Sequence, residues 1–533
     1  MAYPWLVLGG SMLALLMMTY ILYHYFADPA ESYGFAVITV VLSLTVSILC
    51  ALLIPVDIYV ISQGDITSES MHVTISQEHV KLTYMVLFSS LLFLAFCLVP
   101  HAYFYGEERG GDFDERLERT NCCNAMRSTM FFIGLILALL GVGLNFRPGH
   151  TQRLDTAFES QEQAARWVGD LFDYQHGGLN AISFSIACLT CIGVIGWVFY
   201  TAYGMAAMPF DWLRGRQTPT EQRQDLEENI AAIRDKYRSI QARYSAREDG
   251  SLDLSGMKAV DRKELNRLQR EHKSLMQHNY RLQELEQQAG ALIPKLLRCL
   301  VPFRWMIGTS MMSMSLLVVV SLLLSMVDRL FHSPCGLACG YTIKESKIFN
   351  PADEIFLGLS RVFPMDFVVL AILVLYIFFA SLFGIVGLGI RILCLNMYDL
   401  RMRKSMPQAL LVLCNVMAYI LLALCMAMLT IAPDYTSFGS QTMTTAEGTV
   451  GQCRSEAPAA RSTCQVSVIS TLFSSIAISL PLFSVAYFFA NWAFIVVFIT
   501  VFANCLVCQQ RQPFLDHAKE CEEEELSLLS FTQ

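Results

Sequence analysis

Long apolar runs are the feature that most restricts what this chain can fold into. Nine of them have about the 20 residues that an α-helix needs to cross a bilayer. Only 16% of the residues are charged, whereas soluble domains average about 25%. We therefore predict an all-α, polytopic helical membrane protein with about nine transmembrane helices, at residues 5–26, 34–60, 81–105, 127–146, 180–204, 302–327, 365–390, 408–432 and 482–507.

The distribution of Lys and Arg predicts the orientation, because cytosolic loops are enriched in both. With an exoplasmic N-terminus, the cytosolic segments carry 28 of these residues and the exoplasmic loops carry 9. The run 466–508 is long enough for two helices, but nine spans place the C-terminus in the cytosol. We therefore assign 466–481 to an interfacial or re-entrant segment.

Composition divides the chain into four parts: a first membrane part with five spans (1–210), a charged insert (211–300), a second membrane part with four spans (301–508) and an acidic cytosolic tail (509–533). The insert contains two heptad seams, which are typical of a coiled coil. A short connection rich in helix breakers separates them, so we predict a cytosolic antiparallel coiled-coil hairpin. It serves either as a docking arm for a protein partner or as a self-contained stalk. The seams are Leu226, Ile230, Ile233, Tyr237, Ile240 and Tyr244, then Leu265, Leu268, His272, Leu275, Asn279, Leu282 and Leu285.

Several function classes have no support in the sequence. The dipeptide Gly-Lys, which ends a phosphate-binding loop, does not occur, so any ATP-driven step must come from another protein. The zinc-protease motif His-Glu-x-x-His and the nucleophile elbow Gly-x-Ser-x-Gly are also missing. The net charge of −8 provides no basic field for nucleic acid. We expect a protein that is not an enzyme, holds no metal or tight cofactor, and contacts membrane lipid.

Two aspartates beside prolines are the candidate ligand-binding residues. Asp57 follows Pro55 at the end of the second span, and Asp366 follows Pro364 at the start of the seventh. Ionisable residues at membrane depth are often functional, so both could line a vestibule for a polar ligand. The alternative is structural: Asp366 favours the positive end of its helix, and Asp57 reaches interfacial water.

Four exoplasmic cysteines form two local pairs, Cys453 with Cys464 and Cys335 with Cys339. In an oxidising compartment either pair can form a disulfide, and the alternative is free thiols. The pair 453–464 is the stronger candidate, because a separation of eleven residues closes easily.

The acidic tail contains Glu524, Leu528 and Leu529 at the spacing of an acidic dileucine sorting signal for the endosome–lysosome route. Clathrin adaptors read such signals in the cytosol. The motif therefore agrees with the orientation that the Lys and Arg counts predict.

Short segments in a common order extend over nearly the whole chain and give it a resemblance to a known family. Together with nine spans and a large insert after the fifth, they resemble the limb-region and lipocalin-receptor membrane protein family. The segments are 53–58, 183–185, 201–205, 363–366, 407–411, 432–433, 439–441, the loop between Cys453 and Cys464, and 491–494.

The resemblance implies a multi-pass protein of the lysosomal membrane that helps to export cobalamin (vitamin B12) to the cytosol, with cobalamin as cargo. It also implies two partners, a lysosomal ATP-binding-cassette half-transporter of the peroxisomal type and a cytosolic cobalamin-processing chaperone. The alternative within the family is a plasma-membrane endocytic receptor of the lipocalin-receptor type.

Two motifs that this expectation would favour are missing. Lysosomal membrane proteins usually carry N-glycans, yet the chain contains no Asn-x-Ser/Thr. It also lacks the Asp-x-His-x-x-Gly motif of base-off cobalamin enzymes, so no residue is assigned as a cobalt ligand.

Overall fold

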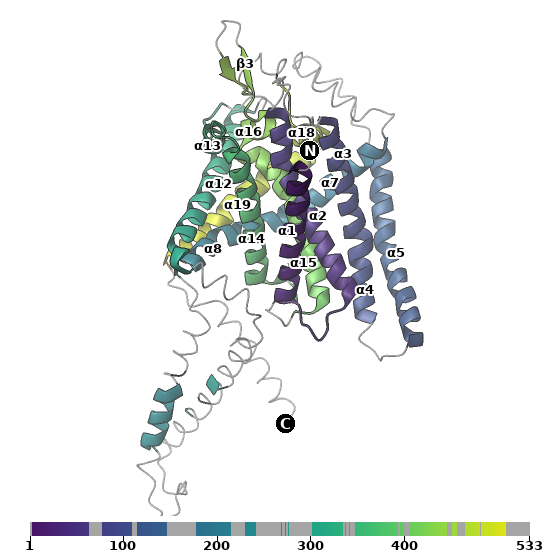
Figure 1. Ribbon diagram of the computed structural model, residues 1–533, viewed down its shortest axis with the longest axis vertical. Helices are drawn as coiled ribbons and strands as arrows, with labels where there is room; N and C mark the ends of the chain where they lie inside the picture. The colour runs from purple at the N-terminus through teal and green to yellow at the C-terminus, as the bar shows by residue number, and fades with distance from the viewer. Residues whose placement is uncertain are drawn as a thin grey trace, which may run out of the picture. The chain divides into compact units, whose positions relative to one another are not determined.

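Helices make up almost all of the regular structure in the described part of the computed structural model (Figure 1). The described residues are 3–62, 77–108, 115–145, 177–214, 227, 230–240, 268, 272, 275–276, 301–333, 336, 341, 347–392, 395–398, 400, 405–444, 450–455, 464–479 and 481–507.

Eight helices in these ranges are long and apolar enough to cross a membrane. Two of the eight are built from three consecutive elements. The first consists of α3 (Gln77–Phe93), η1 (Leu94–Leu98) and α4 (Val99–Glu108), and the second consists of α7 (Gly177–Gly196), η3 (Trp197–Thr201) and α8 (Ala202–Arg214). A third is the apolar part of α5 (Glu115–Asn145). The other five are α2 (Gly34–Ser62), α12 (Arg304–His332), α14 (Met365–Leu388), α15 (Pro407–Ile431) and α19 (Pro481–Val507).

These helices confirm the predicted fold class and coincide with eight of the nine expected spans. The expected first span coincides with α1 (Tyr3–Phe26), which has 24 residues. The helix α18 (Val468–Ser479) has 12 residues. At 1.5 Å per residue it is about 18 Å long, too short for a hydrocarbon core of about 30 Å. A separate helix that does not span agrees with the interfacial or re-entrant segment expected at 466–481.

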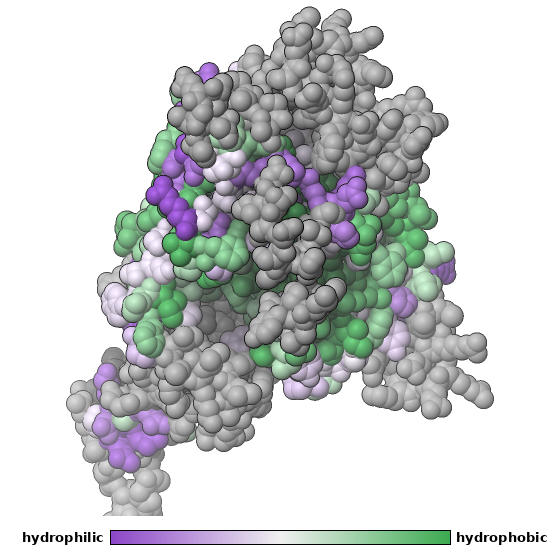
Figure 2. Space-filling view, turned by 45° about the horizontal axis from the view of Figure 1, so that its top comes forward, coloured by the Kyte–Doolittle hydropathy of each residue, from purple (hydrophilic) through white to green (hydrophobic). Residues whose placement is uncertain are grey.

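The outer faces of the helices carry large exposed apolar side chains, among them Ile38, Leu82, Phe131 and Ile195. Figure 2 shows hydrophobic residues gathered in a broad green zone over the helices, with much of the purple, hydrophilic surface beyond it. This distribution is the one expected when lipid tails, and not water, surround the helices.

Small residues allow the inner helices to approach closely. A Cβ atom on Gly204 would overlap the carbonyl oxygen of Ala380, and one on Gly384 would overlap that of Tyr200. The crossing of η3 and α8 with α14 therefore requires glycine on both sides. Lipid tails are as apolar as leucine, so such close packing is a main source of helix association in membranes.

The chain divides into two compact units, residues 1–208 with 311–533, and residues 209–310. In the second unit the described part of the first heptad seam, Ile230, Ile233, Tyr237 and Ile240, is buried or half-buried, and the seven residues between them are exposed. Leu268 of the second seam is also buried. Most of the predicted hairpin lies outside the described residues.

Short elements complete the first unit. The strands β1 (Ile390–Ile392) and β2 (Leu395–Tyr398) form one antiparallel pair, and β3 (Thr442–Thr444) and β4 (Val450–Gln452) form another. Two short helices, α13 (Pro351–Leu359) and α16 (Pro433–Phe438), lie where α14 begins and α15 ends. Figure 1 shows α13, α16, α18 and β3 at the same end of the helices.

Candidate functional site

The helix α16 is the centre of a polar region at this end. Pro433 is the first residue of α16, which follows α15 after Ala432. The N–H at the first position of a helix has no partner within the helix, and proline has no N–H to leave unpaired there. The turn at Ala432, with φ −136° and ψ 74°, separates the two helices. Buried carboxyl groups from three other helices lie next to α16 or to its neighbour α18.

Asp57 holds the start of α18 against the end of α2. Its carboxylate accepts hydrogen bonds from the backbone N–H groups of Val468 (3.3 Å) and Ile469 (2.9 Å) and is fully buried. Ser467 Oγ accepts from Ser470 N (3.2 Å), which caps the same helix end. A carboxylate at a helix N-terminus satisfies free donors and interacts favourably with the helix dipole. The structure therefore gives Asp57 a structural contact 411 residues away in sequence.

Asp366 and a third aspartate, Asp353, both bind Tyr435 of α16. The phenol of Tyr435 donates to Asp366 Oδ2 (2.9 Å), and its backbone N–H donates to Asp353 Oδ1 (2.8 Å). The Tyr435 ring also stacks on Phe356 of α13, with ring centroids 4.9 Å apart and planes 16° apart. These contacts fix α16 to α13 and α14. We call Asp57, Asp353, Asp366, Tyr435 and Ser467 the end cluster.

The two predicted candidates, Asp57 and Asp366, lie at the same end of the helices but have separate partners. Asp57 contacts α18 and Asp366 contacts α16. The link between α16 and α18 runs through other groups: Ser467 N donates to Ser437 O (2.9 Å) and Ser467 Oγ donates to Thr436 O (2.7 Å). Asp366 lies in the first turn of α14, as the structural alternative expected, whereas Asp57 is fully buried and does not reach interfacial water. A role of either residue in ligand binding stays a prediction.

Asp353 is the residue that sequence reasoning missed. It is 5% exposed, and burial, the largest cause, raises its pKa to about 8. A recognisable signal precedes it: Asn350 accepts from Ala352 N (3.0 Å) as the N-cap, and Pro351 stands at the first helical position. Asn-Pro followed by acidic residues indicates a helix start, where a carboxylate is favoured. The signal would have located the helix, although not its buried environment.

A small polar pocket adjoins Asp353. Asp353, Glu354, Asp434 and Arg454 line it together with Asn350 and apolar residues, and its volume is about 40 Å³. Arg454 forms an ion pair with Glu354 that is more than one third exposed on both sides. One water needs roughly 10–15 Å³ by this measure, so the pocket accommodates a few water molecules and is far too small for a large organic cargo.

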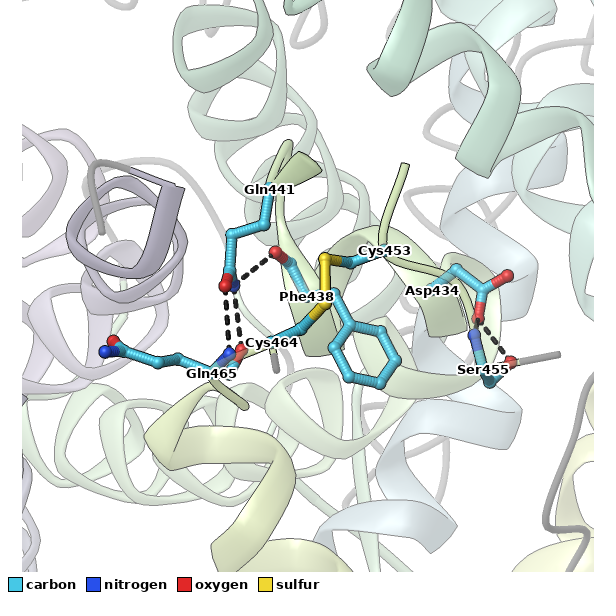
Figure 3. The surroundings of a disulfide bond; sticks show 7 residues. All are labelled: Asp434, Phe438, Gln441, Cys453, Ser455, Cys464 and Gln465. Carbon is cyan, nitrogen blue, oxygen red and sulfur yellow. Dashed lines mark hydrogen bonds between the residues drawn. A yellow bond between two sulfur atoms is a disulfide. The ribbon is translucent and has the colours of Figure 1, made fainter. Parts of the chain in front are cut away.

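A disulfide joins Cys453 and Cys464 next to this pocket (Figure 3). Gln441 holds the two sides of the loop together: its side-chain amide donates to Phe438 O and Gln465 O, both at 2.7 Å, and its side-chain oxygen accepts from Gln465 N at 2.9 Å. The disulfide therefore attaches the strand β4 to the segment that leads into α18. The other predicted pair, Cys335 with Cys339, and the tail residues Glu524, Leu528 and Leu529 lie outside the described residues.

The described residues contain no group of three or more His, Cys, Asp or Glu side chains placed to hold a metal ion. The end cluster consists of buried side chains that form hydrogen bonds within the protein. Its hydrogen bonds mainly connect helices that are far apart in sequence.

Apolar helices of spanning length, closed at one end by a polar cluster, define a polytopic α-helical membrane protein. The family model of LMBR1-like membrane proteins matches residues 6–502, and the chain belongs to this family.

Curated relatives match over nearly their whole length. The mouse lysosomal cobalamin transport escort protein LMBD1 is 29% identical over 97% of this chain and 95% of its own. A probable lysosomal cobalamin transporter of Dictyostelium discoideum is 29% identical over 98% of this chain and 99% of its own. Another, of Neosartorya fischeri, is 30% identical over 96% and 95%. No solved structure matches the chain.

Proposed function

We propose that this chain is a lysosomal membrane protein required for the export of cobalamin from the lysosome to the cytosol. It acts as a transport escort and not as an enzyme. The observation that carries the proposal is the full-length match to relatives named for lysosomal cobalamin transport, which includes both membrane parts and the insert.

The energy for export comes from a partner in this proposal. The chain has no Gly-Lys phosphate-binding loop, so an ATP-binding-cassette half-transporter of the peroxisomal type supplies the ATPase. The insert 211–300 is the segment proposed to dock in the cytosol, where a cobalamin-processing chaperone receives the cargo. The word "escort" in the relatives' names supports a transporter partner.

The proposed orientation places the N-terminus in the lumen and the C-terminus in the cytosol. The Lys and Arg distribution supports it, because the segments with the dense basic clusters are then cytosolic. The end cluster and the disulfide then face the oxidising, acidic lumen, and Glu524, Leu528 and Leu529 face the clathrin adaptors.

The test is cobalamin distribution in cells from which the gene has been deleted. We expect cobalamin to accumulate in purified lysosomes and to return to normal when the full chain is restored. Normal lysosomal cobalamin in the deleted cells would contradict the proposal. Uptake of an extracellular protein ligand that depends on the chain would instead favour the endocytic receptor.

A second measurement tests the partner. The full chain, captured from lysosomal membranes, is expected to bring an ATP-binding-cassette half-transporter with it, and a variant lacking 211–300 is expected to lose it. The matched control is Glu78→Ala on the exposed start of α3, which leaves both the insert and the sorting signal intact. Capture that is unchanged without 211–300 would remove the docking role of the insert.

A further inference from the structure

Helices α2 and α15 bury polar side chains against each other inside the first unit. The two helices lie side by side at its centre (Figure 1). Thr39 and Ser43 lie one helical turn apart on α2, and Gln408 and Asn415 lie two turns apart on α15. In each of the four a side-chain oxygen is buried and has no hydrogen-bond partner within the described part of the chain. We call these four residues the α2–α15 seam.

Unpaired polar atoms at this depth carry a high free-energy cost. Lipid offers no hydrogen bonds, and an orphan group in an apolar medium costs several kcal/mol. Buried polar groups in folded proteins are therefore bonded to protein or to ordered water. Two of the four oxygens, on Ser43 and Asn415, have a small pocket between them.

This pocket has the size and chemistry of a single-water site. Its volume is about 10 Å³, and its polar lining is Ser43, Ser47, Cys414 and Asn415. One water needs roughly that volume and two to four polar partners. The rest of the lining is apolar and comes mainly from α3, η1 and α4, so the pocket is bounded on the side away from the seam.

The donors and acceptors match a water molecule. Ser47 Oγ donates its proton to Ser43 O (2.7 Å), so its oxygen is left to accept. Asn415 Oδ1 can only accept. The hydroxyl of Ser43 lies beside the Cys414 thiol, which is only a weak acceptor, so its proton can be donated to a water instead. A water in the pocket would donate to Asn415 and Ser47 and accept from Ser43, which gives the three bonds typical of buried water.

We propose that this pocket binds one ordered water, which joins α2 to α15 through Ser43, Ser47 and Asn415 in the interior of the membrane domain. The site is independent of cobalamin and of any partner protein. It replaces a direct side-chain contact between the two helices and fixes their depth relative to each other.

The direct test is a density map of the full chain in lipid nanodiscs at a resolution where ordered waters appear. We expect a peak within hydrogen-bond distance of Ser43 Oγ and Asn415 Oδ1. An empty pocket, or a direct bond between the two side chains, would overturn the proposal.

A double-mutant cycle gives a second readout. If one water bridges both side chains, Ser43→Ala and Asn415→Leu each break the bridge, so the double variant should lower the melting temperature by less than the sum of the single effects. The matched control replaces Asn415→Leu by Thr190→Val on α7, where the buried hydroxyl donates to Ile186 O (2.8 Å). The effects of Ser43→Ala and Thr190→Val on the melting temperature should be additive. Additive effects of Ser43→Ala and Asn415→Leu would show that no bridge exists, and a density peak would then belong to a water held by one helix alone.

Discussion

The end cluster and the α2–α15 seam bury polar groups in opposite ways. Asp57 and Ser467 are bonded to backbone N–H groups, and Asp353 accepts from Tyr435 N. The oxygens of Thr39 and Gln408 in the seam have no partner among the described residues. The carboxylates of the end cluster are thus satisfied by donors of the protein itself. The polar oxygens of the seam depend on hydrogen bonds from outside the protein, such as those of the proposed water. Asp366 combines both, because Oδ2 is bonded to Tyr435 and Oδ1 is unpaired within the described chain.

The difference predicts that substitutions in the end cluster are costly and that some in the seam are nearly free. Removing one partner of a made hydrogen bond leaves the other buried and unsatisfied, at about 1–3 kcal/mol. Removing a polar group that has no hydrogen-bond partner leaves no other group unsatisfied, so it costs little free energy of unfolding. The predictions follow this contrast from the largest effect to the smallest.

The largest effect concerns pH and Asp353. Its pKa rises from 3.8 to about 8 in the folded protein, so the protonated form is favoured there. The stabilisation is fully present below the unfolded pKa of 3.8 and is lost as the pH rises through about 8. About four pKa units correspond to roughly 5 kcal/mol. The groups facing Asp353 are Asp434, which raises its pKa further, and Arg454, which lowers it.

The measurement is the thermal stability of the purified chain between pH 4 and pH 9, compared with Asp353→Asn. Asparagine mimics the protonated carboxyl and still accepts from Tyr435 N, so the variant should lose most of this pH dependence. Equal slopes for the two proteins would show that Asp353 is ionised in the fold. In the proposed orientation, the acidic lysosomal lumen lies on the stabilising side of this transition.

The next effect is the loss of the Asp57 cap. Asp57→Ala leaves Val468 N and Ile469 N buried without an acceptor, which should cost about 3 kcal/mol of unfolding free energy. Asp57→Asn keeps one acceptor oxygen and should cost less. Denaturation in detergent measures both, and Glu78→Ala on the exposed start of α3 is the control. Equal stability of Asp57→Ala and the control would mean that the cap contributes nothing.

A smaller effect is expected from the disulfide. Replacing both Cys453 and Cys464 by Ser removes a crosslink over 11 residues, worth about 2–3 kcal/mol. A reducing agent should destabilise the wild type to the level of the double variant and leave the variant unchanged. A wild type that is insensitive to reduction would indicate that Gln441 and the strands hold the loop by themselves.

The sequence predicted the features that depend on local pattern. The spans follow from hydropathy over about 20 residues, and the pairing of Cys453 with Cys464 was suggested by eleven residues of separation. The partner of Asp57 could not be predicted, because it is the backbone of α18, more than 400 residues further along the chain. Asp353 was missed for a related reason: its raised pKa comes from burial under α16, which no local pattern encodes.

The smallest effect gives the sharpest comparison, because it sets two fully buried threonines against each other. Thr436 Oγ1 in α16 donates to Ala432 O (2.6 Å), whereas Thr39 Oγ1 in the seam is unpaired within the described residues. Valine has nearly the same shape as threonine, so each substitution removes the hydroxyl and little else. Thr436→Val should cost about 1 kcal/mol, and Thr39→Val should lie within about 0.5 kcal/mol of the wild type or stabilise the chain slightly. Thermal unfolding of the two variants side by side in the same detergent measures the difference. A larger loss for Thr39→Val would mean that its hydroxyl is bonded, most simply to a second water in the seam, and the seam would then hold a chain of waters instead of one.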